Sequence, residues 1–321
     1  MVGSDRSATR GSESGTTGRN SGYLFHPTVC KSITDSSDEG DGLGLTRRRL
    51  LIGAGGTVGV LGAGGLYVAS ELQGDFGDYT AADSAPAVTT RGRVGPESDE
   101  PATAEIDGDL NFDDADEVFL FVHGFDTDDA TARDQAAAME TGLESLRAMP
   151  VVAYSWDSDL EWGPAKAMAD ANAEPLADWL VDWADEDSRP VHVVGYSLGA
   201  RVTGEALRVL ADEGRTDAVT SVTLLGGAIP NDTAGKSGRY GAAIAAVDGP
   251  VTNFHNADDR VLGWIYRLSD RTQAVGQTGL PESVDAPAGY EDVDVTEGVP
   301  DHYSYFQPEE GCLPDVVDRL P

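Results

Sequence analysis

Apolar and polar positions along most of the chain form blocks that predict strands and helices in turn. The continuous apolar run at residues 118–122 is typical of a strand buried on both faces. Further predicted strands are residues 151–156, 191–194, 219–225, 251–255 and 293–296. Apolar residues at helical spacing predict helices at residues 130–149, 165–185, 200–207 and 261–268, with a short helix at 235–247. Repeated strand–helix units predict the α/β class, with a mostly parallel central sheet flanked by helices on both faces.

The part of the chain before this pattern has a different composition. Residues 1–44 are rich in Gly, Ser, Thr and charged residues without apolar periodicity, which predicts a disordered segment. Residues 71–110 mix Ala, Pro, Gly, Thr and acidic residues without a period, which indicates an acidic linker with a short first strand near its end. We therefore expect the folded domain to occupy residues 111–321.

Residues 45–70, between these two segments, resemble a twin-arginine (Tat) export signal. Thr46-Arg47-Arg48-Arg49-Leu50-Leu51 leads into an uncharged, glycine-rich stretch at residues 50–69. A glycine-rich helix is weak and suits a transient signal, although about 20 apolar residues also suffice for a lasting membrane anchor. We expect export by the Tat machinery, to the outside or to the outer face of the membrane, with cleavage left open.

Acidic residues dominate the composition. The chain of 321 residues has 56 acidic and 22 basic residues and a formal net charge of −34. The excess continues through the domain predicted to fold, where Lys166 and Lys236 are the only lysines. Such a surface repels nucleic acid and anionic lipid head groups, which argues against a nucleic-acid partner. Because salt screens self-repulsion, the composition is typical of a halophilic, haloarchaeal-type protein.

Cysteine and histidine usage gives no sign of a disulfide framework or a metal centre. The two cysteines are Cys30, in the segment predicted to be disordered, and Cys312 near the end of the chain. No cysteine and histidine residues have the spacing of metal ligands. We expect neither a metal nor another cofactor.

The pentapeptide Gly195-Tyr196-Ser197-Leu198-Gly199 lies between a predicted strand and a predicted helix. A G-x-S-x-G in this setting predicts a nucleophile elbow, in which a strained turn presents Ser197 at the edge of the sheet. The N-terminus of the helix that follows favours negative charge. The alternative is an ordinary structural turn, since a chain with 39 glycines matches this pattern easily.

A serine hydroxyl needs a neighbouring base, and the chain has five histidines. His123 precedes the nucleophile, and His192 is too close to it in sequence and is expected to pack inside its strand. His302 follows the last predicted strand, as the base does in the chain order Ser, acid, His. His255, at the end of the strand 251–255, is the weaker alternative.

The acid and the oxyanion donors are sought at the ends of other strands. Asp258 and Asp259 follow the strand 251–255, and both qualify physically as the residue that orients the base. For the oxyanion, the backbone N–H of Leu198 and that of Phe125, in the loop after the strand 118–122, are the expected donors. An ordinary turn is the alternative interpretation of that loop.

These motifs together resemble the α/β-hydrolase superfamily over residues 112–321. More narrowly, the chain is similar to α/β hydrolases of a domain-of-unknown-function group, which carry a V-H-G-F loop, a strand ending in S-W, an H/Y-S-x-G-x-R elbow and a D-x-V/A-L acid loop. Here these are Val122-His123-Gly124-Phe125, Ser155-Trp156, Tyr196-Ser197-Leu198-Gly199-Ala200-Arg201 and Asp259-Arg260-Val261-Leu262. The last match favours Asp259 over Asp258.

Residues and resemblance together predict a serine hydrolase that acts on carboxylic esters by acyl transfer. Ser197, Asp259 and His302 are its expected triad, with Phe125 and Leu198 at the oxyanion hole. A peptidase or thioesterase of the same fold and a non-catalytic binding module at the cell surface are the alternatives.

The cap over the expected site is short. The segment between Gly226 and Val251 is too small for a large lid domain. Trp156 and Trp162 follow a neighbouring strand, and either shape the acyl pocket or pack in the core.

Overall fold

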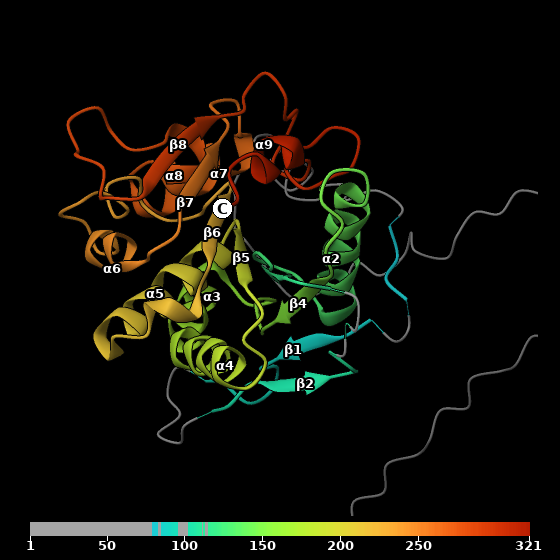
Figure 1. The fold of residues 1–321 in the computed structure, drawn as a ribbon. Coiled ribbons are helices and arrows are strands. Elements are labelled where there is room, and N and C mark those ends of the chain that lie inside the picture. Colours follow the sequence, from blue (N-terminus) through green and yellow to red (C-terminus); the bar gives the residue numbers. More distant parts are fainter. Residues whose placement is uncertain (1–78, 83–84, 96–101, 111, 113–114) are drawn as a thin grey trace, which may run out of the picture. The chain divides into compact units, whose positions relative to one another are not determined.

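The structure, a computed structural model, describes residues 79–82, 85–95, 102–110, 112 and 115–321 (Figure 1). The segment predicted to be disordered and the predicted export signal lie outside these residues. No helix among the described residues has the length and apolar character that crossing a membrane requires.

Eight strands of the described chain form one sheet in the order β2-β1-β4-β3-β5-β6-β7-β8. The strands are β1 (Ala87–Thr89), β2 (Glu105–Asp107), β3 (Val118–Val122), β4 (Val151–Ser155), β5 (Val191–Tyr196), β6 (Ser221–Leu225), β7 (Val251–His255) and β8 (Tyr290–Asp294). Neighbouring strands are parallel throughout, except that the edge strand β2 runs antiparallel to β1. The predicted mostly parallel sheet is confirmed.

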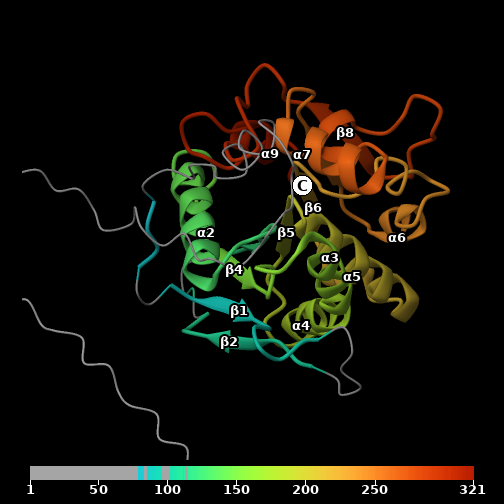
Figure 2. The same cartoon turned by 180° about the vertical axis from the view of Figure 1, so that it is seen from behind.

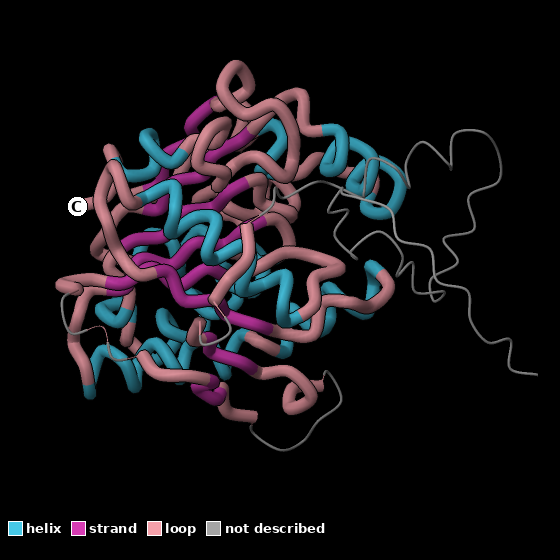
Figure 3. The backbone as a smooth tube through the Cα atoms, turned by 90° about the vertical axis from the view of Figure 1, so that its right-hand side faces the viewer, coloured by secondary structure: helices cyan, strands magenta, loops and turns pink. Residues whose placement is uncertain are grey.

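Helices cover both faces of this sheet (Figures 1 and 2). They are α2 (Asp129–Leu143), α3 (Trp162–Ala171), α4 (Ala173–Glu186), α5 (Gly199–Glu213), α6 (Gly241–Ala246), α7 (Arg260–Ile265), α8 (Val275–Thr278) and α9 (Leu313–Val317). A 3₁₀ turn η1 (Thr216–Ala218) and a π-helical turn η2 (Tyr266–Asp270) complete the described helical elements. Figure 3 shows the strands passing between the two helical layers.

The alternation of side chains along β3 explains why both faces are covered. Phe119 and Phe121 point into one apolar cluster, with residues of α2 and α9. Val118, Leu120 and Val122 point into the other cluster, with residues of α3, α4, α5 and α6. All five side chains are fully buried, as expected of a strand without a polar face.

One predicted helix, at residues 165–185, is two helices in the structure. They meet at Asn172, whose side chain donates to the carbonyl of Met168 and accepts from the hydroxyl of Thr90, 2.6 Å away. Pro175 has no N–H to continue the hydrogen-bond ladder across this point. The break is therefore stabilised by a contact to a distant segment, which apolar spacing does not reveal.

Other boundaries differ by a few residues. Helix α2 ends at Leu143 instead of continuing to residue 149, and Leu146 beyond it is exposed. The last strand of the sheet is Tyr290–Asp294 instead of residues 293–296. Helices α8 and α9, of four and five residues, are too short to give a periodic signal and were not predicted.

Strands β1 and β2 lie within residues 71–110, the segment assigned to an acidic linker. β1 pairs with β4 over Ala87–Thr89, and β2 pairs with β1. A short first strand was expected near the end of that segment, but the sheet takes in two strands, the first of them from its middle. The sheet therefore begins before the expected boundary at residue 111.

Gly199, the first residue of α5, allows this helix to begin directly against the end of β3. A Cβ at Gly199 would lie 2.1 Å from the carbonyl oxygen of Val122, whereas a Cβ at Gly163 in α3 meets nothing within 4 Å. We expect Gly199→Ala to lower the free energy of unfolding by roughly 2–4 kcal/mol through overpacking. Gly163→Ala, the matched control, should leave it unchanged or raise it by up to about 1 kcal/mol. Denaturant unfolding at fixed salt measures both, and a loss below about 1 kcal/mol for Gly199→Ala would contradict the packing argument.

Candidate active site

Ser197 occupies a strained turn between β5 and α5. Its φ is 51°, in the left-handed region that residues with a side chain rarely adopt. The turn is held by the Ser197 N–H, which donates to Leu225 O at 3.0 Å, and by the Ser197 carbonyl, which accepts from Ala200 and Ala228 at 3.1 and 2.8 Å. Strain of this kind persists only where the surroundings hold it, and here β6 and α5 do so.

The loop after β3 lies directly against this turn. A Cβ at Gly124 would come within 2.8 Å of the Ser197 Cβ, and a Cβ at Gly195 would come within 2.9 Å of Ala200 Cα. Glycine at these two positions therefore permits the close approach of loop, strand and helix. The backbone around Phe125 is consequently placed beside the serine.

The structure brings Ser197, His302 and Asp259 into one hydrogen-bonded chain. His302 Nε2 lies 2.9 Å from Ser197 Oγ, and His302 Nδ1 lies 2.6 Å from Asp259 Oδ2. Ser197 is 7% exposed, His302 4% and Asp259 0%. A serine, a histidine and a carboxylate linked in this order have the geometry for proton transfer from the hydroxyl to the imidazole.

The two neighbouring aspartates, Asp258 and Asp259, have different surroundings. Asp259 is the N-cap of α7, and its Oδ1 accepts from the N–H of Leu262 at 2.9 Å while Oδ2 faces His302. Both of its oxygens are therefore fixed. Asp258 is exposed, and its described hydrogen bond is made by its backbone N–H, to Asn256 Oδ1. The structure thus places Asp259, and not Asp258, at the imidazole.

Two buried tyrosines that sequence reasoning missed support the histidine and the acid. The Tyr196 hydroxyl donates to the His302 carbonyl at 2.9 Å, and the Tyr305 hydroxyl lies 3.5 Å from Asp259 Oδ2 and donates to Gly276 O at 3.2 Å. Burial raises the pKa of both hydroxyl groups well above its usual value, so both stay protonated donors. Tyr196 lies inside the pentapeptide, but nothing in the sequence connects it to residue 302.

The two predicted oxyanion donors have N–H groups available. Within the described residues, neither the Phe125 N–H nor the Leu198 N–H has a hydrogen-bond acceptor. Leu198 is fully buried at the start of α5, where the helix N-terminus favours negative charge. A buried N–H without an acceptor is costly, and this applies to Leu198, whereas Phe125 is half-buried.

His123 belongs to this loop but does not approach Ser197 as a base. Its Nε2 accepts from the Trp156 N–H at 3.0 Å, and its Nδ1 lies 2.9 Å from the Gly124 carbonyl. Burial, and secondarily the charge of Arg91, lower the pKa of His123 to about 3, so the imidazole is neutral near pH 7. Its role is to shape the loop.

The remaining histidines of the described chain lie elsewhere. His192 is packed in β5 between Ser221 Oγ and Glu117 Oε2, as expected for a strand histidine. His255 ends β7, and its buried Nδ1 has no partner among the described residues. The structure thus brings His302, and not His255, to the serine. No group of three or more His, Cys, Asp or Glu side chains in the described residues could hold a metal ion.

The two tryptophans after β4 have separate roles. Trp156 is fully buried, stacks on His123 and donates its indole N–H to the His123 carbonyl, so it packs beneath the loop. Trp162 is half-buried and makes edge contacts with Phe125 and with Tyr266 of η2. Trp162 therefore connects Phe125, a predicted oxyanion donor, to the segment between β7 and β8 and is the better candidate for a pocket wall.

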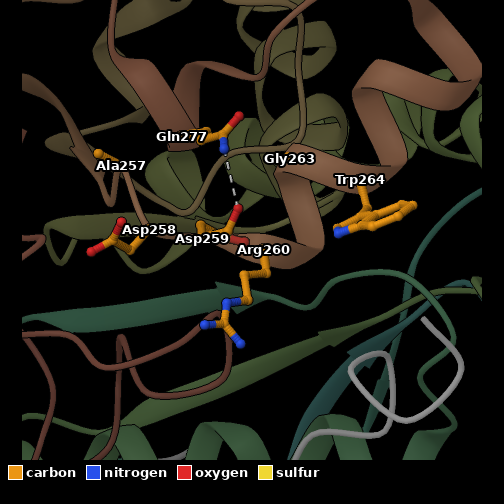
Figure 4. Close-up of a pocket in the computed structure, with 7 residues that line it drawn as sticks. All are labelled: Ala257, Asp258, Asp259, Arg260, Gly263, Trp264 and Gln277. Atoms are coloured by element: carbon orange, nitrogen blue, oxygen red, sulfur yellow. Dashed lines mark hydrogen bonds between the residues drawn. The ribbon is translucent and has the colours of Figure 1, made fainter. Parts of the chain in front are cut away.

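A cavity of about 430 Å³ lies beside the acid loop and the start of α7. It is lined by Ala257, Asp258, Asp259, Arg260, Gly263, Trp264 and Gln277, without Ser197 or His302. Figure 4 shows Gln277 donating to the backbone carbonyl of Asp259, while the side chains of Asp258, Arg260 and Trp264 point in different directions. These groups do not converge on one ligand position, so the cavity is not the candidate active site.

Comparison with known proteins gives a family of unknown function. A family model described as "Protein of unknown function (DUF726)" matches residues 134–316. The chain is 34% identical over 186 residues to the "Transmembrane and coiled-coil domain-containing protein STS1" of Oryza sativa subsp. japonica, covering 55% of this chain and 26% of that protein. It is 33% identical over 144 residues to the "Uncharacterized membrane protein C6F6.13c" of Schizosaccharomyces pombe, covering 45% and 24%. The chain spans about a quarter of the length of these relatives.

Solved structures with the same general architecture include hydrolases of very low identity. They are YbtT, titled a type II thioesterase (13% identity, TM-score 0.38, 65% of this chain and 94% of that chain), an acetylxylan esterase (14%, 0.38, 64% and 99%) and a Pyrobaculum calidifontis esterase (14%, 0.36, 63% and 75%). The sheet order, the helices on both faces and the elbow between β5 and α5 are those of the α/β-hydrolase fold.

The neutral His123 predicts a pH dependence of stability. The unfolded chain binds a proton at this histidine below about pH 6.5, whereas the folded chain, with the pKa of His123 at about 3, does not. As the pH falls from about 6.5 to about 3, this residue therefore lowers the free energy of unfolding by up to about 1.4 kcal/mol per pH unit. Above about pH 6.5 it has no such effect.

The change His123→Gln removes that titration while retaining an acceptor for the Trp156 N–H. We expect the stability gap between the wild type and His123→Gln to narrow by about 2 kcal/mol from pH 7 to pH 5. Urea unfolding at both pH values and fixed salt measures it. A gap that is the same at both pH values would show that His123 titrates normally.

Proposed function

We propose that this chain, which belongs to the DUF726 family of proteins of unknown function, is a serine hydrolase that cleaves carboxylic esters by acyl transfer. The observation that carries the proposal is the buried chain of hydrogen bonds from Ser197 through His302 to Asp259, built on a strained elbow. A structural turn does not need a base and an acid in this order, whereas covalent catalysis by a serine does.

In the proposed mechanism, Ser197 Oγ attacks the acyl carbon while His302 Nε2 takes the hydroxyl proton. Asp259 accepts a hydrogen bond from His302 Nδ1–H, which fixes the tautomer and stabilises the imidazolium. The imidazolium then returns its proton to the leaving alcohol as the carbon–oxygen bond breaks. Water, deprotonated by the same histidine, attacks the acyl-enzyme, and the released serine oxygen regains a proton.

The negative charge that develops on the carbonyl oxygen is stabilised by the Phe125 and Leu198 N–H groups. Both lie beside Ser197, and neither has another acceptor among the described residues. Fixed donors of this kind are typically worth about 10²–10³-fold in kcat each. Thioester and peptide bonds require the same groups, so the natural acyl substrate is to be identified by a panel of esters and thioesters of graded chain length.

The adjacent aspartates allow a matched test of the triad. We expect Ser197→Ala and Asp259→Asn to lower kcat for p-nitrophenyl butyrate by at least about 10³-fold, because each removes a member of the proton-transfer chain. Asp258→Asn makes the same chemical change on an exposed neighbour, and its kcat should stay within about twofold of the wild-type value. Assays are run in molar KCl because the net charge is −34.

Denaturant unfolding of each variant establishes that the fold is retained. A fluorophosphonate probe provides an independent readout, and it should label the wild type and not Ser197→Ala. Wild-type activity in purified Ser197→Ala protein, or a folded wild type that neither turns over esters nor takes up the probe, would favour the non-catalytic binding module instead.

We also propose that the protein is exported by the Tat machinery and held at, or released from, the outer face of the membrane. The run Arg47-Arg48-Arg49 followed by the uncharged stretch at residues 50–69 supports this location. Two relatives are named as membrane proteins, which is compatible with membrane association.

Export through Tat depends on arginine and not merely on positive charge. We expect replacement of Arg47, Arg48 and Arg49 by Lys to leave the protein inside the cell, when a tagged chain is followed by fractionation in a halophilic host. Arg10 and Arg19 lie upstream of this signal, so the variant with both changed to Lys should be exported as the wild type is. Unchanged export of the triple variant would rule out the Tat signal.

A further inference from the structure

We propose that Arg91, in the turn after β1, is a positioning residue that holds the oxyanion loop, residues 123–127, against Ser197. This inference rests on the proposed function and adds to it a residue far from the triad in sequence. Both Arg91 and the loop precede residue 134, where the family match begins. Residues before position 134 would therefore contribute to the proposed active site together with the matched part of the chain.

Arg91 bonds both ends of the oxyanion loop. Its Nη2 donates to the Thr127 carbonyl at 2.7 Å and lies 3.2 Å from His123 Nε2. Its Nε donates to Ser155 Oγ at the end of β4, 2.7 Å away. The arginine side chain is 18% exposed, so this planar fork of donors is largely enclosed. A single side chain thus ties the start and the end of the loop to the sheet.

The donor chemistry of Arg91 fixes the tautomer of His123. A guanidinium only donates hydrogen bonds, and so does the Trp156 N–H, which also faces His123 Nε2 at 3.0 Å. Nε2 must therefore accept, and the imidazole proton is on Nδ1. That proton is donated to the Gly124 carbonyl at 2.9 Å.

The Gly124 carbonyl and the Phe125 N–H belong to the same peptide unit. In a planar trans peptide the two groups point in opposite directions, so fixing the carbonyl fixes the N–H. The chain of contacts from Arg91 through His123 to the Gly124 carbonyl therefore sets the direction of the proposed oxyanion donor. The next peptide is held separately, because Asp126 N–H donates to Ser158 O at 3.0 Å.

Carboxylates balance the charge of Arg91 without occupying its bonds to the loop. Asp157 lies 3.6 Å from Nη1, and Asp129 lies 3.9 Å from Nε. Ser155 Oγ, which accepts from Arg91, donates in turn to Asp129 at 2.7 Å. The guanidinium is thus oriented by Ser155 and by these two carboxylates in addition to its bonds to the loop.

Arg93 provides a matched control for Arg91 on the same turn. Its side chain is 43% exposed and pairs with Glu105 of β2, without a described contact to the loop. The test compares Arg91→Ala, Arg91→Lys and Arg93→Ala in three measurements. They are kcat and KM for p-nitrophenyl butyrate, the inhibition constant of an alkyl trifluoromethyl ketone, which forms an oxyanion on the enzyme, and hydrogen exchange of peptides covering residues 121–128.

We expect Arg91→Ala to lower kcat about 10–100-fold with KM within about threefold, because the loss is confined to the oxyanion. The inhibition constant of the ketone should rise by the same factor as kcat/KM falls. Hydrogen exchange of the loop should accelerate, while Arg93→Ala stays within about twofold of the wild type in all three measurements. Arg91→Lys keeps the positive charge but not the planar fork of donors, so its values should lie between those of the wild type and Arg91→Ala. This variant replaces Arg91→Ala in the test if Arg91→Ala does not fold.

A loss of stability in the Arg91 variants with kcat and the inhibition constant within about twofold of the wild type would overturn the inference, as would unchanged hydrogen exchange of the loop. The exchange measurement needs no turnover. If the wild type is inactive and Arg91→Ala still accelerates hydrogen exchange of the loop, the proposed function is contradicted. The positioning role of Arg91 would then stand.

Discussion

The left-handed turn at Ser197 is the constraint on which the rest of the structure depends. A residue with a side chain holds a φ of 51° only when its neighbours compensate the strain, and here hydrogen bonds from β6 and α5 do so. The turn also requires α5 to start at the very end of the sheet, where Gly199 meets the carbonyl of Val122. The loop after β3 fits only because Gly124 leaves room beside the serine. The position of this serine is thus a consequence of packing, and the stability of the sheet supports it.

Local sequence patterns predicted the elements that surround this turn and most of the groups that face it. A continuous apolar run located β3, and mainly apolar segments bounded by turn residues located β4 to β7, because strands buried on both faces keep few polar positions. The order of a nucleophile elbow and a late histidine located Ser197 and His302, which the fold brings within 2.9 Å. The residues alone did not separate Asp258 from Asp259, since both follow β7. Their difference arises from the start of α7, which buries one carboxylate and leaves the other exposed.

The features that the sequence did not reveal depend on contacts between distant segments. Strands of three residues, such as β1 and β2, carry no measurable period. β1 was assigned to a linker for that reason, whereas a short strand was expected near the end of that segment, where β2 lies. At the break between α3 and α4, Asn172 accepts a hydrogen bond from Thr90, which directly follows β1. Arg91 follows Thr90, so the end of the same strand contacts the helix break and also places the arginine at the loop after β3. A short strand without a sequence signal therefore links the fold of the sheet edge to the proposed oxyanion hole.

Burial divides the electrostatics of this protein into two regimes. Outside, a net charge of −34 makes the surface sensitive to salt, because dissolved ions screen the repulsion between exposed charges. Inside, burial lowers the pKa of His123 and raises that of Tyr196 and Tyr305, so these groups are uncharged near pH 7 and only donate or accept hydrogen bonds. In the proposed mechanism every proton then passes through His302, since these neighbouring groups neither release nor take one. Salt acts mainly on solubility and on association of the whole molecule, while the geometry of the site depends on hydrogen bonds that salt barely reaches.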